Sequence, residues 1–233
     1  AHAVCNLDKV EAAISDPQKF TMVQCAPAVR VAIAEEFGAD LGTLSPGKLA
    51  AALRAVGFDR IYDTNFPADV TIMEEGTELI KRVTEGGTLP MFTSCCPAWS
   101  VLAKRTLSKE LAETVSSALT PMVATARTIK KRHPDSKIVF VGPCAAKKLE
   151  ASRTTVRSDV DFVITFEELE AIFEAKGIDM ATYDCEEPIH DATGTGRGYA
   201  VAGGVASAIE NCINEYYPGT EVYLSLIHID AAD

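Results

Sequence analysis

Lys137-Ile-Val-Phe-Val-Gly142 is the stretch that decides the fold class of this 233-residue chain. After Lys137 its residues are apolar, three of them are β-branched, and no polar residue alternates with them, which is the pattern of a strand buried on both faces. Thr21–Cys25 and residues 161–166 are predicted to be strands as well. Helical patterns separate these strands, so the sequence predicts an α/β fold built from parallel sheets with crossover helices.

Start and stop signals place the helices. Pro27 opens one pattern, Ser45-Pro46 reads as an N-cap and a first helical residue, and Gly86-Gly87 ends a third pattern. The predicted helices cover residues 28–37, a segment that starts at Pro46, residues 69–83 and residues 167–176. Residues 90–94 form a short extended run that ends at a pair of cysteines.

Composition restricts the classes of function. The chain carries 33 acidic and 22 basic residues, a net charge of −11, and an acidic surface repels the phosphate backbone of nucleic acids. It has no apolar run of the ~20 residues that span a bilayer and no basic stretch followed by an apolar core, so a cytoplasmic protein is expected. The first residue is not Met, so the sequence is interpreted as a piece of a longer chain.

The seven cysteines lie at positions 5, 25, 95, 96, 144, 185 and 212. Their number is odd and two are adjacent, so reduced thiols or metal ligands fit better than a disulfide framework. Three predicted strand ends carry four of them: Gln24-Cys-Ala-Pro27, Thr93-Ser-Cys-Cys-Pro-Ala-Trp99 and Gly142-Pro-Cys-Ala-Ala-Lys147. Because ligands of open α/β sheets bind beyond the carboxyl ends of strands, a common site that collects Cys95, Cys96 and Cys144 is predicted.

These cysteines also have a simpler interpretation. Cys95 and Cys96 can be two small buried hydrophobic residues, and Cys144 can be a buried cysteine at the end of a strand. A lysine within one turn, Lys147, favours the thiolate that binds iron. Cys212 lies in an amphipathic pattern and is expected to be a core residue.

Glu75, Glu78 and Arg82 share one helical face at i, i+3 and i+7. Such a face is usually solvated, and the alternative is a carboxylate relay for protons. The Gly-rich stretch from Gly194 to Gly198 matches neither the P-loop nor the dinucleotide fingerprint, so it is interpreted as a tight loop that leads into a helix.

The motifs resemble those of the iron-only ([FeFe]) hydrogenases. The segment from Thr93 to Trp99 is similar to their first signature, and Gly142-Pro-Cys-Ala-Ala-Lys-Lys-Leu-Glu150 is similar to their second, which usually has Met in place of Gly142. Ala26-Pro27 and residues 71–78 resemble further family segments, and the resemblance covers about residues 8–223. It implies two lobes of α/β structure that flank a cluster site.

The resemblance implies an H-cluster, a [4Fe–4S] cubane joined to a diiron unit. Cys96 and Cys144 would ligate the cubane, and Cys95 would pass protons to the diiron unit. The proton path would continue from Cys95 through Glu75, Ser116, Glu78 and Arg82. Lys147 would hydrogen-bond a cyanide of the diiron unit. The other residues implied to lie around the cofactor are Ala26, Pro27, Thr120, Pro121, Pro143 and Tyr199.

The sequence also departs from the family pattern. A [4Fe–4S] cluster has four protein ligands, and the family takes the other two from a C-x-x-x-C segment that this sequence does not contain. Residues 1–223 are therefore interpreted as a partial catalytic domain. Residues 224–233 are interpreted as a non-native tail, because Leu224-Ser-Leu-Ile-His-Ile229 is what a common transposase sequencing adapter encodes.

The function that the resemblance implies is reversible reduction of protons to H2 in an anaerobic cell. Ferredoxin or a similar carrier would supply electrons, maturation proteins would assemble the cofactor, and the truncated chain alone would be inactive. One alternative is a hydrogenase-like protein of iron–sulfur cluster assembly. Such relatives typically lack the first cysteine of the pair, so Cys95 favours a hydrogenase. A second alternative is a sensory hydrogenase.

Overall fold

The computed structural model describes residues 4–43, 45–185 and 192–220. The chain forms two compact units. The first comprises Ala1–Thr64 and Met122–His190, and the second comprises Asn65–Pro121 and Asp191–Asp233. Within the described ranges, no helix combines the length and the apolar character that crossing a bilayer requires.

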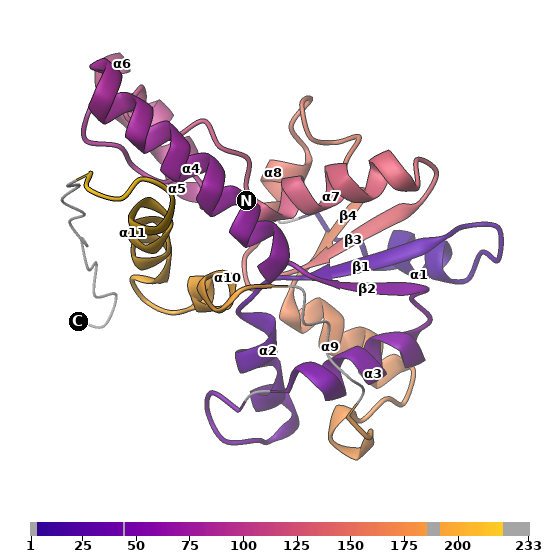
Figure 1. The fold of residues 1–233 in the computed structure, drawn as a ribbon. Coiled ribbons are helices and arrows are strands. Elements are labelled where there is room, and N and C mark those ends of the chain that lie inside the picture. Colours follow the sequence, from indigo (N-terminus) through magenta and orange to yellow (C-terminus); the bar gives the residue numbers. More distant parts are fainter. Residues whose placement is uncertain (1–3, 44, 186–191, 221–233) are drawn as a thin grey trace. The chain divides into compact units, whose positions relative to one another are not determined.

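A four-stranded parallel sheet forms the centre of the first unit (Figure 1). Its strands are β1 (Thr21–Cys25), β2 (Arg60–Asp63), β3 (Lys137–Val141) and β4 (Phe162–Ile164), in the order β2-β1-β3-β4. Every neighbouring pair is parallel, so the predicted α/β class with crossover helices is confirmed. The sequence analysis missed β2, because this edge strand is only partly buried and lacks the apolar pattern of β1 and β3.

Helices cover both faces of this sheet. They are α1 (Leu7–Ile14), α2 (Val29–Ala32), η1 (Ile33–Phe37), α3 (Pro46–Val56), α7 (Pro121–Arg132), α8 (Ala146–Ala151), α9 (Phe166–Ala175) and η2 (Met180–Thr182). Val23 and Val139 face the core that α3 and α9 complete. Gln24 points to the opposite face, where its amide donates to the carbonyl of Met122 in α7 at 3.1 Å.

The predicted helices of this unit are largely confirmed. The helix expected over residues 28–37 is divided into α2 and η1, and α3 begins at Pro46 as predicted. Ser45 precedes α3, but its side chain makes no capping hydrogen bond. α9 begins one residue earlier than expected and carries a capping box, in which Thr165 and Glu168 bond each other's backbone N–H groups.

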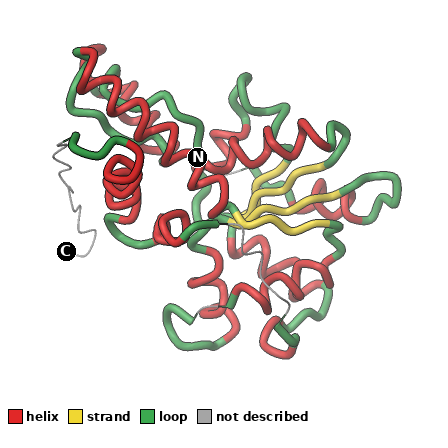
Figure 2. Tube along the Cα trace, viewed as in Figure 1, coloured by secondary structure: helices red, strands yellow, loops and turns green. Residues whose placement is uncertain are grey.

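The second unit is helical over its described residues (Figure 2). Its elements are α4 (Asn65–Glu85), α5 (Pro97–Thr106), α6 (Lys109–Ala112), α10 (Gly194–Arg197), η3 (Gly198–Ala200) and α11 (Gly204–Tyr216). α4 begins four residues before the predicted position, because Pro67 in the first turn is compatible with a helix. Gly86 follows α4 with a φ of 81°, as its predicted role as terminator requires.

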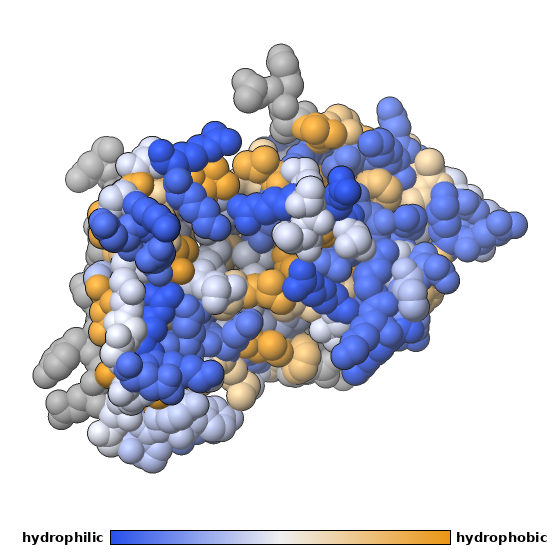
Figure 3. Space-filling model, turned by 90° about the horizontal axis from the view of Figure 1, so that it is seen from above, coloured by the Kyte–Doolittle hydropathy of each residue, from blue (hydrophilic) through white to orange (hydrophobic). Residues whose placement is uncertain are grey.

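The extended run expected over residues 90–94 is not a strand. It makes a single parallel bridge between Phe92 and Val115. Cys212 is confirmed as a core residue, because α4 and α11 pack through a cluster that contains Ile72, Leu79 and Cys212. Hydrophilic residues cover large parts of the face seen in Figure 3, with hydrophobic residues scattered between them.

Candidate functional site

Two of the three cysteine-bearing segments lie at one edge of the sheet in the first unit. The N–H of Ala26 donates to the carbonyl of Val141 at 2.9 Å, and the N–H of Gly142 donates to Ile164 at 3.1 Å. Ala26-Pro27 and Pro143-Cys144 therefore leave neighbouring strands at their carboxyl ends, as predicted. The third segment, residues 93–99, follows no strand and belongs to the second unit.

Cys144 stands at the entrance to α8. Its sulfur is partly exposed and accepts a hydrogen bond from the N–H of Ala146 at 3.3 Å. Lys147, one turn further on, forms an ion pair with the buried carboxylate of Glu150 at 2.8 Å. This environment differs from a buried strand-end cysteine, because the thiol has an oriented N–H donor and access to solvent.

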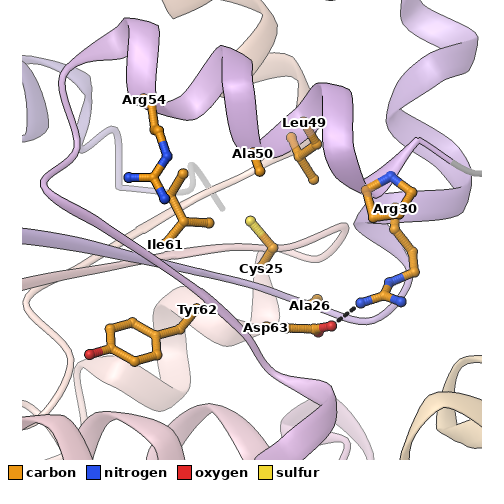
Figure 4. A pocket seen from close by; sticks show the side chains of 10 residues that line it. Cys25, Ala26, Arg30, Leu49, Ala50, Arg54, Ile61, Tyr62 and Asp63 are labelled. Carbon is orange, nitrogen blue, oxygen red and sulfur yellow. Dashed lines mark hydrogen bonds and ion pairs between the residues drawn. The ribbon is translucent and has the colours of Figure 1, made fainter. Parts of the chain in front are cut away.

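Cys25 provides a contrast within the same unit. It is buried, and its desolvation raises the pKa of the thiol to about 12, although the charge of Arg30 lowers it slightly. Its sulfur faces a small cavity of about 60 Å³ lined by Leu49, Ala50 and Ile61, beside the Arg30–Asp63 ion pair (Figure 4). A thiol that stays protonated is a poor iron ligand.

The adjacent cysteines of the second unit have different environments. Cys96 is the exposed N-cap residue of α5, and its sulfur accepts from the N–H of Trp99 at 3.5 Å. Pro97 occupies the first helical position and directs the chain there. Cys95 is partly buried. The interpretation of the pair as two small buried hydrophobic residues is therefore wrong for Cys96.

Glu75 is fully buried on α4. One of its carboxylate oxygens, Oε1, accepts from the N–H of Ser94 at 3.1 Å, which places the residue before Cys95 on this carboxyl group. Desolvation is the main cause that raises the pKa of Glu75 to about 7; the Ser94 N–H lowers it and the charges of Glu78 and Glu74 raise it further. A carboxyl group with this pKa both accepts and releases protons at neutral pH.

Glu78 lies one turn further along α4 and is paired on both oxygens. Ser116 donates its hydroxyl to Oε2 at 2.7 Å, and Arg82 forms an ion pair with Oε1 at 2.5 Å. Burial alone would raise the pKa of Glu78, but the hydrogen bonds from Ser116, Arg82 and Ser117 lower it overall. The solvated-face interpretation of this helix is therefore wrong.

Arg82 is held in place by the loops around it. Its guanidinium donates to the carbonyls of Thr88 at 3.1 Å and Thr114 at 3.0 Å. The structure thus brings together five residues of the predicted proton path within the second unit: Glu75, Glu78, Arg82, Cys95 and Ser116.

The remaining predicted residues of this unit are buried or partly buried. Thr120 and Pro121 are buried at the start of α7. Tyr199 packs against the α4–α11 cluster, and burial, followed by the charges of Cys95 and Glu75, raises the pKa of its hydroxyl. Over the described ranges, no group of three His, Cys, Asp or Glu side chains gathers to hold a metal ion.

The sequence analysis missed the parts played by Ser94 and Ser117. Ser94 holds Glu75 through its backbone N–H, and Ser117 N donates to Glu78 Oε2 at 3.2 Å. Because every residue except proline has a backbone N–H, no side-chain motif marks such donors.

Comparison with known proteins agrees with these motifs. The family model described as the C-terminal domain of the iron-only hydrogenase large subunit matches residues 19–228. Iron hydrogenase 1 of Clostridium pasteurianum is 37% identical over 232 residues, which cover 93% of this chain and 40% of that protein. Cytosolic iron-sulfur assembly component 3 of Rattus norvegicus is 27% identical, over 83% of this chain and 47% of that protein.

Solved structures show the same fold. The apo [FeFe]-hydrogenase HydA1 from Chlamydomonas reinhardtii matches with a TM-score of 0.81 and 36% identity, over 99% of this chain and 63% of that one. The chain spans about 40% of the length of the Clostridium relative. Because the family model matches residues 19–228 and the fold is shared, this chain belongs to the family of the iron-only hydrogenase large subunit.

Proposed function

We propose that this chain is part of the catalytic domain of an enzyme that reversibly reduces protons to H2. The observation that supports this most is the buried Glu75 carboxyl group, which accepts from the N–H of Ser94, the residue before Cys95. Glu78 follows one turn later on the same helix and accepts from the hydroxyl of Ser116, which lies in the loop before α7. A thiol beside a buried carboxyl group that titrates near neutral pH is suited to carry protons into a site closed to solvent.

The residues present fit part of an iron–sulfur cofactor. Cys96 and Cys144 would each ligate the [4Fe–4S] cubane, and both sulfurs accept a backbone N–H, a contact that tunes cluster potentials. When bound, the H-cluster would supply the electrons and the iron that binds hydrogen. Its surroundings would be formed by Lys147, Ala26, Pro27, Pro143, Thr120, Pro121 and Tyr199.

The chain's own residues would move the proton. A proton on Glu78 Oε2 passes to the Ser116 hydroxyl, which releases its own proton toward Glu75 and remains a hydroxyl. Glu75 then passes a proton to Cys95. Arg82 holds Glu78 in its charged form between transfers, because their ion pair favours the carboxylate.

Residues 1–223 would be a partial catalytic domain, inactive alone, since two cubane ligands are outside this sequence. The proposed non-native tail, residues 224–233, lies outside the described residues. Ferredoxin or a similar carrier would supply electrons, and maturation proteins would build the cofactor. We place the protein in the cytoplasm of an anaerobic cell, which fits seven free thiols.

The test is expression of the longest reading frame that contains this sequence, together with cluster maturation proteins and under anaerobic conditions. H2 production with reduced ferredoxin is expected from the matured protein, as is a loss with Cys95→Ser. A protein with its full iron content and no H2 turnover in either direction refutes the proposal. The alternative, cluster assembly, then predicts transfer of iron and sulfide to an apo-protein acceptor.

A further inference from the structure

Gly142 is a buried residue of the first unit, directly before Pro143-Cys144, to which the proposed function gives no role. The sheet defines its place. Its N–H donates to the carbonyl of Ile164 at 3.1 Å, and the carbonyl of the residue before it, Val141, accepts from the N–H of Ala26 at 2.9 Å. Gly142 therefore lies at the carboxyl edge of the sheet, next to Pro143 in the chain and beside the strand exit that carries Ala26.

The backbone of Gly142 does not itself require a glycine, because its φ lies outside the left-handed region that other residues avoid. The obstacle to a side chain is the ring of Phe140. A Cβ atom on residue 142 would lie 2.5 Å from Phe140 Cε1 and 3.2 Å from Cζ. Carbon atoms in contact are normally about 3.5–4.0 Å apart. The ring and a side chain on residue 142 therefore exclude each other.

The Phe140 ring is fixed in the interior of the first unit and is only 2% exposed. In the sheet register, Phe140 stands beside Gln24 of β1 and Val163 of β4. It therefore shares the face of Gln24, whose amide donates to the carbonyl of Met122 in α7. Since α7 covers this face, the ring cannot turn into solvent to make room for a second side chain.

We propose that Phe140 is a specificity-determining residue of the cofactor site: its ring fills the space of a side chain on residue 142 and forms an apolar wall at the exit of β3. Residues 140 and 142 then act as one pair of fixed total size. An aromatic ring is rigid, whereas Met, which the family motif usually has in place of Gly142, is flexible and carries a polarizable sulfur. The apolar shell around a metal site controls solvent access and reduction potential. The pair therefore determines which kind of side chain the cofactor meets.

The role at the cofactor rests on the proposed function, but the exchange of size needs no cofactor. It is tested in the cluster-free chain by amide hydrogen exchange of β1 and β3, which measures the opening of the first unit. Gly142→Met overpacks the site and is expected to speed exchange about tenfold. Phe140→Ala leaves a cavity and is expected to speed it about 100-fold or more. The double variant conserves total size, so Gly142→Met added to Phe140→Ala should slow exchange about tenfold instead.

Val139→Ala is the matched control, because Val139 is the neighbouring buried residue of β3 and faces the opposite core. In that background Gly142→Met should still speed exchange. The proposal is overturned if Gly142→Met has the same effect with and without the Phe140 ring, or no effect on the wild type. If Phe140→Ala does not fold, Gly142→Ala is compared in the wild type and in Phe140→Leu. It should speed exchange only in the wild type, and equal effects in both overturn the proposal.

In the matured, longer protein, the double variant puts a thioether in place of the ring. The infrared bands of the CO and cyanide ligands of the diiron unit are expected to shift, whereas Val139→Ala should leave them unchanged. Unchanged bands in the double variant would show that residue 142 does not face the cofactor and would overturn the proposal. If the unsubstituted protein has its full iron content and no H2 turnover, the proposed function fails, whereas the hydrogen-exchange result on Phe140 stands.

Discussion

The carboxyl group of Glu75 should contribute less to the free energy of unfolding as the pH rises, the opposite of what a carboxyl group with a lowered pKa does. Its pKa rises from 4.5 to about 7 on folding, mainly through burial. Between these two values the folded state binds more protons than the unfolded state, so stability falls as pH rises. At about 1.4 kcal/mol for each pKa unit, the contribution of Glu75 to the free energy of unfolding should decrease by about 3 kcal/mol between pH 4 and pH 8.

The perturbation that isolates this effect is Glu75→Gln, which keeps the shape of the side chain and cannot ionise. Near pH 4 the free energy of unfolding of the variant should be equal to that of the wild type or slightly lower. At pH 8 the variant should be more stable than the wild type by up to about 3 kcal/mol. Every other titrating group is shared, so the difference between the two curves reports Glu75 alone. Glu78→Gln is the matched control with the opposite sign. Its pKa is lowered in the fold, so the wild-type advantage over that variant is present above the unfolded pKa and is lost as pH falls.

The assay is urea unfolding of the cluster-free chain at a series of pH values. The single tryptophan, Trp99, provides the fluorescence signal from the second unit, where its ring lies 5.7 Å from that of Phe92. A difference between wild type and Glu75→Gln that stays flat from pH 4 to pH 8 would refute the reasoning. It would mean that Glu75 is solvated in the folded chain.

Three further predictions follow from single contacts. Cys95→Ser in the matured protein should lower H2 turnover by about 100-fold or more with unchanged iron content, because an alcohol is a much weaker acid than a thiol. A rate within about threefold of wild type would exclude the thiol as a proton carrier. Ser116→Ala removes the 2.7 Å hydrogen bond to Glu78, so it should lower the free energy of unfolding in urea by about 1.5–3 kcal/mol and reduce H2 turnover. The control is Ser117→Ala, because the Ser117 hydroxyl lies 3.5 Å from Glu78 Oε2, and it should change stability and turnover much less. Thr165→Ala removes the capping box of α9 and should lower the free energy of unfolding by about 1 kcal/mol, with no change in H2 turnover of the matured protein. An unchanged midpoint of urea unfolding would contradict this expected loss of stability.

The sequence alone was sufficient to predict much of the sheet and to locate the cysteine motifs. β1 and β3 were predicted within one residue, because a strand buried on both faces has an apolar run with no alternation that few other structures share. The assignment of Cys96 and Cys144 as cluster ligands rests on the resemblance of short motifs, which are local in the chain, and it stays a prediction. Cys212 was likewise predicted as core from helical periodicity.

Tertiary structure alone decided the state of the side chains on α4. The spacing of Glu75 and Glu78 is the same on a solvated helix and on a buried one, and only the packing of α11 and of residues 94–118 shows that Glu75 is enclosed. The same holds for β2, whose partly exposed residues pair only because β1 lies beside them. The backbone donor to Glu75 comes from a segment distant in sequence, and pKa values respond to such neighbours in space.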